Sequence, residues 1–429
     1  MLIRADARSI PLASGSVQCC VTSPPYWGLR KYEGEQELIW RSDDLVIERF
    51  ENHKIPESQN HPMEWRGALG HEPLHDCLAW AKGDPLCNRC YVCHVVLIFR
   101  EVRCVLRDDG TCWLNMGDAY SGSWGNQGRK AERGGQRPIN GPILQRVQDG
   151  RYPVQEHNTG DCPPGLKPKD LCGIPWRVAM ALQADGWYLR SDIIWSKPNP
   201  MPESVRDRPT KAHEYVFLLT KSPRYFYDAE AVAEPHKRLW DASNGGNLSP
   251  DGIHKRHDGF TERGGHYPLP NPAGRNLRSV WEVATQPYSG SHFATFPERI
   301  PEIAIRAGTS ERGCCPKCGA PWARKMAKKR EFTRPIPDHG KYADGFKSEH
   351  RTKAGLVGRP IVFESQTLGW KPTCQCDAGD PVPCIVLDPF AGSGTTGEVA
   401  YKLGRRFVMV DLAYQGHQAK RIPPMALIS

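Results

Sequence analysis

The feature that most restricts the fold of this chain lies late in the sequence, in residues 384–411. An apolar stretch ends at Asp388 and is followed by a glycine-rich turn and a segment with the composition of a helix. The glycines have the spacing G-x-G-x-x-G, and a second apolar stretch ends at Asp411, 19 residues after Gly392. Between a strand and a helix, this turn predicts a site for an adenosine-containing cofactor, with a carboxylate placed to bind ribose hydroxyls.

The place of this motif in the chain restricts the topology. Only 18 residues follow Asp411, too few for the further β–α units that a nucleotide-binding sheet requires. The other strands must therefore come from earlier residues, and we predict strands at 17–21 and 191–195 and a helix that begins at Pro175. The predicted class is α/β, with a mostly parallel sheet, helices on both faces and a circularly permuted order of strands.

A second motif, T-S-P-P-Y-W, directly follows the predicted strand at 17–21. Proline has no N–H to donate, and its ring fixes φ at about −65°. The two prolines therefore form a rigid elbow whose carbonyl groups have no competing donors, next to the hydroxyl of Ser23 and the ring of Tyr26. From these residues alone, a turn that merely carries aromatic side chains is an equally good interpretation.

Together and in this order, the two motifs resemble those of the β-class amino-methylating DNA methyltransferases. Members of that family depend on S-adenosylmethionine and modify N4 of cytosine or N6 of adenine. The similarity covers about half of the chain in the family's order, and the further matching segments are residues 3–8, 99–118, 187–204, 213–221 and 292–302.

The resemblance implies a Rossmann-like methyltransferase fold and a role for each motif. A serine hydroxyl and a proline carbonyl would accept the hydrogen bonds of the target amine, while the tyrosine stacks on a base flipped out of the duplex. The implied catalytic residues are Ser23, Pro24, Pro25 and Tyr26. The implied cofactor-binding residues are Asp6, Asp388, Pro389, Phe390, Gly392, Ser393, Gly394, Thr395, Thr396 and Asp411. Of these, Asp411 would bind the ribose and Asp6 the adenine amino group; for Phe390, ordinary core packing is an equal alternative.

The serine of the elbow indicates which base is the target. In the resembling family, S-P-P-Y is more typical of N4-cytosine enzymes and D-P-P-Y of N6-adenine enzymes. We therefore predict a site-specific methyltransferase that acts on N4 of a flipped cytosine in double-stranded DNA. The alternatives are N6-adenine methylation by the same fold and a non-catalytic, zinc-containing nucleic-acid binder. An amine of RNA or protein would also suit the elbow, but the basic charge and Tyr26 favour nucleic acid.

The chain has 16 cysteines and no export signal, which favours metal ligands over disulfides. The pairs Cys315–Cys318 and Cys374–Cys376 have the spacing of a structural zinc site with four thiolates, with Cys314 as a spare residue. We expect the two pairs to be separated by a basic loop that includes residues 327–334. Free buried thiols are the alternative.

A second group of ligand-type residues is less regular in spacing. Cys87 and Cys90 resemble another knuckle, with Cys77 and His75 as its candidate partners. The sequence favours a second zinc ion here no more than it favours simple packing. The residues that follow, Cys93 and His94, are expected to begin a helix and to pack in the core.

Charge and apolar content indicate the partners and the location of the protein. The formal charge of +9 favours an acidic partner, for which we predict double-stranded DNA. With no signal-like start and no apolar run of about 18 residues, we expect a cytoplasmic protein without a membrane partner. No endonuclease motif is present, so a restriction endonuclease would be a separate partner; the oligomeric state and the recognised sequence are not specified.

The expected parts of the chain are 1–227 (catalytic, with insertions 34–98 and 120–165), 228–280 (basic, target recognition) and 281–429 (cofactor-binding, with a zinc-ribbon-like insertion at 312–380).

Overall fold

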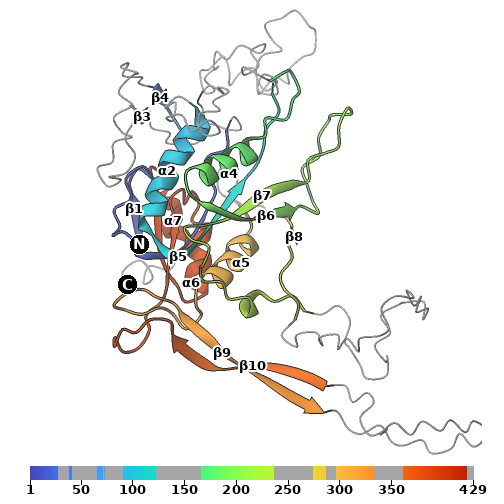
Figure 1. The fold of residues 1–429 in the computed structure, drawn as a ribbon. Coiled ribbons are helices and arrows are strands. Elements are labelled where there is room, and N and C mark those ends of the chain that lie inside the picture. Colours follow the sequence, from blue (N-terminus) through green and yellow to red (C-terminus); the bar gives the residue numbers. More distant parts are fainter. Residues whose placement is uncertain are drawn as a thin grey trace, which may run out of the picture.

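In a computed structural model of the chain, one eight-stranded sheet organises the molecule (Figure 1). The strand order is β1-β12-β11-β2-β5-β7-β6-β8. The structure describes residues 1–27, 38–40, 65–70, 72, 90–121, 166–235, 274–286, 296–332 and 361–422. Most of the predicted insertions at 34–98 and 120–165, and the middle of the predicted target-recognition region, lie outside these residues.

The sheet is mostly parallel, as predicted. Its strands are β1 (Leu2–Arg4), β12 (Arg406–Asp411), β11 (Ile385–Asp388), β2 (Val17–Thr22), β5 (Leu106–Met116), β7 (His213–Thr220), β6 (Tyr188–Ser196) and β8 (Val280–Glu282). Neighbouring strands are parallel except where β7 pairs with β5 and β6. The last two strands in sequence lie between the first two, which agrees with the need for earlier residues to complete the sheet. That this order is a circular permutation stays a prediction.

Helices cover both faces of the sheet. They are α2 (Tyr91–Val105), α4 (Ile174–Ala184), α5 (Arg299–Gly308), α6 (Thr395–Lys402), α7 (Gln415–Arg421) and the 3₁₀ helix η3 (Glu230–Val232). Strand β2 lies between two apolar clusters: Cys20 packs with α2 and α4, whereas Cys19 and Val21 pack with α5 and α6. Because side chains alternate along a strand, a β-strand buried on both faces reads as a mainly apolar run, here interrupted by Gln18. None of the helices in the described ranges has the length and apolarity needed to cross a membrane.

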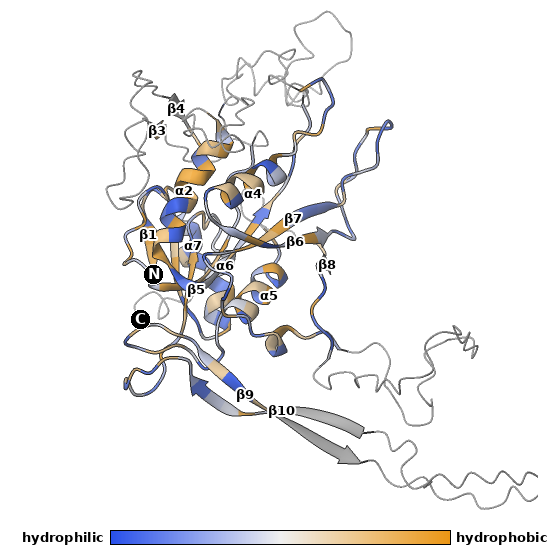
Figure 2. Cartoon of the chain, viewed as in Figure 1, coloured by the Kyte–Doolittle hydropathy of each residue, from blue (hydrophilic) through white to orange (hydrophobic). Residues whose placement is uncertain are grey.

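Helix α2 is buried on nearly all sides, and Figure 2 shows it as a largely hydrophobic segment. Part of its cover is the strand β3 (Leu38–Trp40), which pairs with β4 (Trp65–Gly67). The ring of Trp40, only 1% exposed, stacks on His94 with 3.8 Å between ring centroids. The Nδ1 atom of His94 lies 2.8 Å from a carboxylate oxygen of Glu72. The prediction that Cys93 and His94 lie at the start of a helix and pack is confirmed.

The predicted basic loop that includes residues 327–334 is wrong for its described part. Residues Trp322–Phe332 form strand β9, which pairs antiparallel with β10 (Ile361–Pro372) in a hairpin that projects from the body of the molecule (Figure 1). Local composition alone indicates a charged loop, because the partner strand lies nearly thirty residues further along the chain. Pairing with that strand satisfies the backbone groups of the basic segment and makes it a strand.

Candidate active site at the carboxyl ends of β2 and β11

The two sequence motifs meet at one edge of the sheet. Strands β2 and β11 are parallel neighbours, so their carboxyl ends lie together. The hydroxyl of Thr22 donates to Oδ1 of Asp388 at 2.7 Å, across 366 residues of sequence. On the same carboxylate, Oδ2 accepts a hydrogen bond of 2.7 Å from the hydroxyl of Thr396 in α6. Asp388 is only 2% exposed, and burial raises the pKa of its carboxyl to about 6. The end of β2, which leads into the elbow, and the cofactor loop are therefore joined by one carboxylate.

The elbow leaves two hydrogen-bond acceptors unused. The hydroxyl of Tyr91, the first residue of α2, donates to the carbonyl of Pro25 at 2.8 Å. Within the described part of the chain, neither the hydroxyl of Ser23 nor the carbonyl of Pro24 has a hydrogen-bond partner. Ser23 is half-buried and Pro24 is buried. The elbow can thus accept hydrogen bonds from an incoming donor at two neighbouring atoms.

The ring of Tyr26 is buried and fixed at its hydroxyl end. The hydroxyl donates to Oε2 of Glu214 at 2.6 Å and accepts from Nδ2 of Asn115 at 2.7 Å. The other oxygen of Glu214 forms an ion pair with Lys197. A Cβ atom at Gly117 would come within 2.7 Å of the tyrosine ring, so only glycine fits beneath it. Sequence reasoning missed the three polar partners, because they come from β5, β6 and β7.

The glycine-rich loop places open space next to this edge. Gly392 has a φ of +47° and Gly394 a φ of +88°, both in the left-handed region that favours glycine. A Cβ atom at Gly392 would meet only the carbonyl oxygen of Phe390, at 3.9 Å, which leaves room for a ligand against the backbone. By contrast, a Cβ atom at Gly397 would lie 2.3 Å from the sulfur of Met409, so this glycine lets α6 pack on β12.

The loop is held by the last residue of β12 and by residues of α7. One carboxylate oxygen of Asp411 accepts the N–H of Gly392 at 2.8 Å, and burial raises the pKa of this carboxyl. From α7, Nε2 of Gln418 donates to the carbonyl of Gly392 at 3.1 Å. A guanidinium nitrogen of Arg421 donates to the hydroxyl of Ser393 at 3.0 Å. The two α7 residues carry no recognisable motif, and sequence reasoning did not find them.

The remaining predicted cofactor residues lie at or near the same edge. Asp6 follows β1, the neighbour of β12, and its two carboxylate oxygens accept hydrogen bonds of 2.9 Å from the backbone N–H and Nε of Arg8. Phe390 is half-buried and packs against the apolar cluster of α2 and α4, which supports the core-packing alternative. Thr395 begins α6 and Pro389 follows β11. Their contacts with a cofactor stay predictions.

Four cysteines form a compact cluster at the opposite edge of the sheet. The sulfur atoms of Cys315, Cys318, Cys374 and Cys376 all lie within 4.8 Å of one another. Tetrahedral zinc with Zn–S bonds of about 2.3 Å places its sulfur ligands about 3.8 Å apart, so the cluster suits this ion. Cys314 is not part of the cluster, which agrees with its prediction as a spare residue. The carbonyl of Gly319 accepts a hydrogen bond of 3.2 Å from Gln18 near the start of β2, which places the cluster away from the elbow.

The second predicted ligand group is mostly outside the described residues. This applies to His75, Cys77 and Cys87. Cys90 is described and buried, and its sulfur accepts a hydrogen bond of 3.5 Å from the backbone N–H of Cys93 at the start of α2. A second zinc site stays a prediction.

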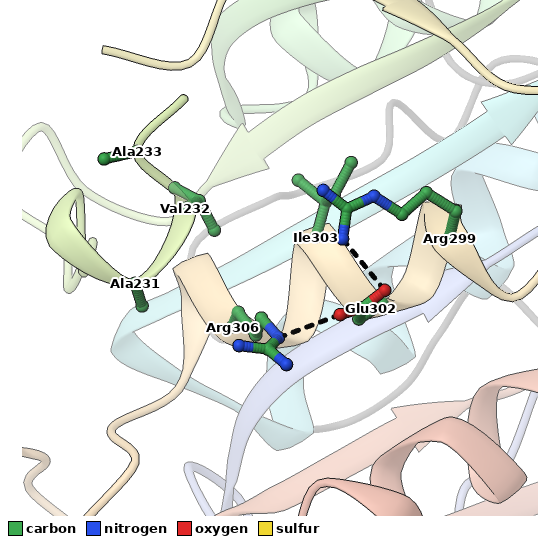
Figure 3. A pocket seen from close by; sticks show the side chains of 7 residues that line it. All are labelled: Ala231, Val232, Ala233, Arg299, Glu302, Ile303 and Arg306. Carbon is green, nitrogen blue, oxygen red and sulfur yellow. Dashed lines mark hydrogen bonds and ion pairs between the residues drawn. The ribbon is translucent and has the colours of Figure 1, made fainter. Parts of the chain in front are cut away.

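A cavity of about 290 Å³ lies elsewhere, between η3 and α5 (Figure 3). Its charged lining residues are Arg299, Glu302 and Arg306, and Glu302 forms ion pairs with the two arginines at 2.9 and 3.1 Å. No residue of either sequence motif lines this cavity. It is therefore separate from the candidate active site.

A mostly parallel sheet with a glycine-rich loop, a following carboxylate and an acceptor-bearing elbow at one edge defines an α/β protein of the nucleotide-cofactor type. The sequence matches the DNA methylase family of N6/N4 methyltransferases over residues 17–315 and 383–419, and the chain belongs to this family. The expectation of a DNA amino-methyltransferase is confirmed. The unmatched interval, 316–382, contains the β9–β10 hairpin and three of the four clustered cysteines.

Two relatives are the Type II methyltransferases M.XycI of Xanthomonas campestris pv. cyanopsidis and M.Cfr9I of Citrobacter freundii. Each is 39% identical to this chain over 311 residues, which are 72% of this chain and 72% of the relative. Among solved structures, PvuII DNA methyltransferase (cytosine-N4-specific) aligns with 98% of this chain and 86% of its own, at 13% identity and a TM-score of 0.45. A similarity this low carries no conclusion about the target base.

Proposed function

We propose that the protein transfers a methyl group from S-adenosylmethionine to the exocyclic N4 amine of a cytosine flipped out of double-stranded DNA. The observation that carries this proposal is the pair of unused acceptors, the hydroxyl of Ser23 and the carbonyl of Pro24, at the edge where the cofactor loop opens. An exocyclic amine has two N–H donors, so two adjacent acceptors match it in number and polarity.

The residues at this edge suit the proposed cofactor. S-adenosylmethionine, when bound, supplies an electrophilic methyl group on a sulfonium. The open space in front of Gly392 would take its methionine portion, and Asp411 would accept hydrogen bonds from the ribose hydroxyls. Asp6, beyond the end of the neighbouring β1, would lie near the adenine amino group. All three residues follow adjacent parallel strands, the usual location of such ligands in an open α/β sheet.

The chain's own contribution to the chemistry would be positioning. The lone pair of an exocyclic amine is conjugated into the base, which makes the nitrogen a poor nucleophile. Hydrogen bonds from its two N–H groups to Ser23 and Pro24 would localise that lone pair and direct it toward the cofactor loop. The Pro25 carbonyl is engaged by Tyr91, so the first proline of the elbow supplies the acceptor. The fixed ring of Tyr26 would stack on the flipped base.

One experiment separates this proposal from its alternatives. The protein is incubated with methyl-labelled cofactor and bacterial genomic DNA, the DNA is digested to nucleosides, and the labelled nucleoside is identified. N4-methylcytosine supports the proposal, and N6-methyladenine would replace it by the adenine alternative. Absence of transfer, with DNA binding retained, would favour the non-catalytic binder. The proposed partner is therefore double-stranded DNA, and any cognate restriction endonuclease would be a separate chain.

We also propose that the four-cysteine cluster holds a structural zinc ion. All four ligand positions would be filled by thiolates, leaving no open position for a substrate. Elemental analysis of the purified protein tests this: less than one equivalent of zinc per chain refutes the site. The double variant Cys374→Ser/Cys376→Ser should lose one equivalent, whereas Cys314→Ser, a matched change outside the cluster, should keep it. A remaining equivalent in the double variant would support the second site at Cys87, Cys90, Cys77 and His75.

A further inference from the structure

The loop between β6 and β7 begins and ends near Tyr26, the residue proposed to stack on a flipped base, and the proposed position of that base is called the base pocket below. It is closed at its root by a hydrogen bond of 2.8 Å from the backbone N–H of Lys197 to the carbonyl of Ala212. The side chain of Lys197 also forms an ion pair with Glu214, the residue that binds the hydroxyl of Tyr26. From this root the loop projects beyond the ends of both strands (Figure 1). The root of the loop and the ring of Tyr26 are therefore joined through one residue, Glu214.

The loop carries an exposed apolar side chain on a stiff backbone. Its sequence begins K-P-N-P-M-P-E, and Met201 is 82% exposed, the highest fraction among the large hydrophobic residues that the structure describes. Prolines at 200 and 202 fix their own φ angles and restrict the preceding residues. Single exposed apolar residues are common on protein surfaces. The significance of this one comes from its place beside the pocket and from the rigidity of its surroundings.

Side-chain contacts hold the rest of the loop in shape. The amide of Asn199 exchanges two hydrogen bonds with the backbone of Thr285, at 2.9 and 3.4 Å. Across the loop, Arg208 forms an ion pair of 2.5 Å with Glu203. The same guanidinium lies 3.8 Å from the centre of the Tyr120 ring. The loop is therefore braced on both sides before any partner is bound.

One cation of the loop is available to a partner. Arg206 is exposed and takes part in no ion pair or hydrogen bond within the described ranges, whereas Lys197 and Arg208 are paired with carboxylates. An arginine in this position suits a phosphate group of nucleic acid, which fixes the register of a protein on the duplex. Met201 is the fourth residue after Lys197, at most about 14 Å away along an extended chain, so the exposed methionine stays close to the pocket.

We propose that this loop is the wedge that keeps the duplex open, with Met201 entering the base stack beside the flipped base and Arg206 binding the adjacent backbone. The inference rests on the proposed function. Unstacking a base step costs a few kcal/mol, and proteins that open or kink DNA commonly offset this cost by inserting an apolar side chain such as methionine. The pocket and the wedge would then be two ends of one rigid unit, joined through Glu214.

The test compares Met201→Ala with the wild type on two forms of a DNA that the wild type methylates. In one form the target is paired; in the other an abasic site lies opposite it, so that the target is already unpaired. Met201→Ala should slow single-turnover methylation of the paired DNA about 10- to 100-fold and stay within about threefold of the wild type on the unpaired DNA. Leu368→Ala, a matched exposed residue on β10, should match the wild type on both.

Two results would overturn the wedge: Met201→Ala as fast as the wild type on paired DNA, or equally slow on both forms. A wild type that transfers no methyl group to any DNA in the genomic-DNA assay would refute the proposed function instead, so the two failures are distinguishable. Arg206→Ala supplies an independent measurement. It should weaken DNA binding and lower the slope of log affinity against log salt by about 1, with the ratio of rates on paired and unpaired DNA unchanged.

Discussion

Two turns stand side by side at the carboxyl ends of β2 and β11, and they present different groups. Each has a proline near the end of its strand: Pro24 follows Ser23, the first residue after β2, and Pro389 follows Asp388, the last residue of β11. The elbow then continues with a second proline and exposes carbonyl acceptors. The other turn continues with glycines and exposes backbone without side chains. In one sheet, prolines after one strand would thus present hydrogen-bond acceptors to an amine, and glycines after the neighbouring strand would leave open space for a cofactor.

The two turns also differ in what holds them. The elbow is held by residues of α2 and β7, because Tyr91 binds the carbonyl of Pro25 and Glu214 binds the hydroxyl of Tyr26. The glycine loop is held by β12 and α7, because the carboxylate of Asp411 and the amide of Gln418 bind the backbone of Gly392. Substitutions should therefore affect the two turns separately: catalysis at the elbow, and cofactor affinity at the loop.

The largest expected effect is at the elbow. Ser23→Ala should lower the single-turnover rate by about 10²- to 10³-fold, because removing one preorganised hydrogen-bond partner of a reacting group typically costs this much. Tyr26→Ala should also lose turnover. In both variants the dissociation constant for S-adenosylmethionine, measured by calorimetry, should stay within about twofold. Ser16→Ala, before the amino end of the same strand, is the control. A normal methylation rate in either elbow variant would show that the elbow is not the catalytic clamp.

A smaller effect is expected at the glycine loop. Gly392→Ala and Gly404→Ala both place a side chain at positive φ, +47° and +71°, and should each cost about 1–2 kcal/mol of stability. Only Gly392→Ala also places a methyl group in the open space next to the loop, so it alone should raise the cofactor dissociation constant, by about 10-fold or more. Calorimetry and urea unfolding measure the two quantities. Equal cofactor affinity in the two variants would show that the cofactor does not bind next to Gly392.

Removal of metal should separate stability from catalysis. The cysteine cluster lies at the amino end of β2, far from the elbow. A chelator should therefore lower the unfolding temperature by several degrees, while the methylation rate of the still-folded protein at low temperature falls by less than about threefold. Thermal unfolding and a single-turnover assay on the same sample provide the measurements. A complete loss of activity without unfolding would contradict a purely structural site.

A separate effect, on stability alone, concerns Asp388, the residue that joins the two turns. Burial raises the pKa of Asp388 from 3.8 to about 6, so the folded state binds a proton more readily than the unfolded chain. The contribution of this group is fully present below pH 3.8 and is lost as the pH rises through 6. From pH 7 to pH 4 the wild type should therefore gain up to about 3 kcal/mol relative to Asp388→Asn. Urea unfolding of both proteins at several pH values checks this, and a constant difference would refute the raised pKa.

Much of the catalytic edge could be predicted from local sequence, because each motif carries its own secondary structure. The strand predicted at 17–21 is observed at 17–22, and the apolar stretch before Asp388 forms β11. The helix predicted to begin at Pro175 begins one residue earlier. Glycine spacing and consecutive prolines restrict the backbone directly, so each turn could be predicted from its own residues. The two turns meet at one edge because the strands before them are parallel.

The contacts that complete the site could not be predicted in this way. Glu214 and Asn115 reach Tyr26 from strands far away in sequence, and no local pattern distinguishes them from other polar strand residues. The same holds for the basic segment at 327–332, which is a strand only because a distant segment pairs with it. Long-range pairing decides these features, and the composition of one segment does not reveal its partner.

The interleaving of early and late strands has a consequence for biosynthesis. Among the described strands, β1 pairs only with β12, which the ribosome makes about four hundred residues later, and one side of β2 likewise waits for β11. A nascent chain thus holds β1 without a partner strand, and β2 paired on one side only with β5, until the last strands are made. The elbow meets the glycine-rich loop only when the late strands have been made, so fragments released early would lack one half of the proposed site and would be unable to modify DNA.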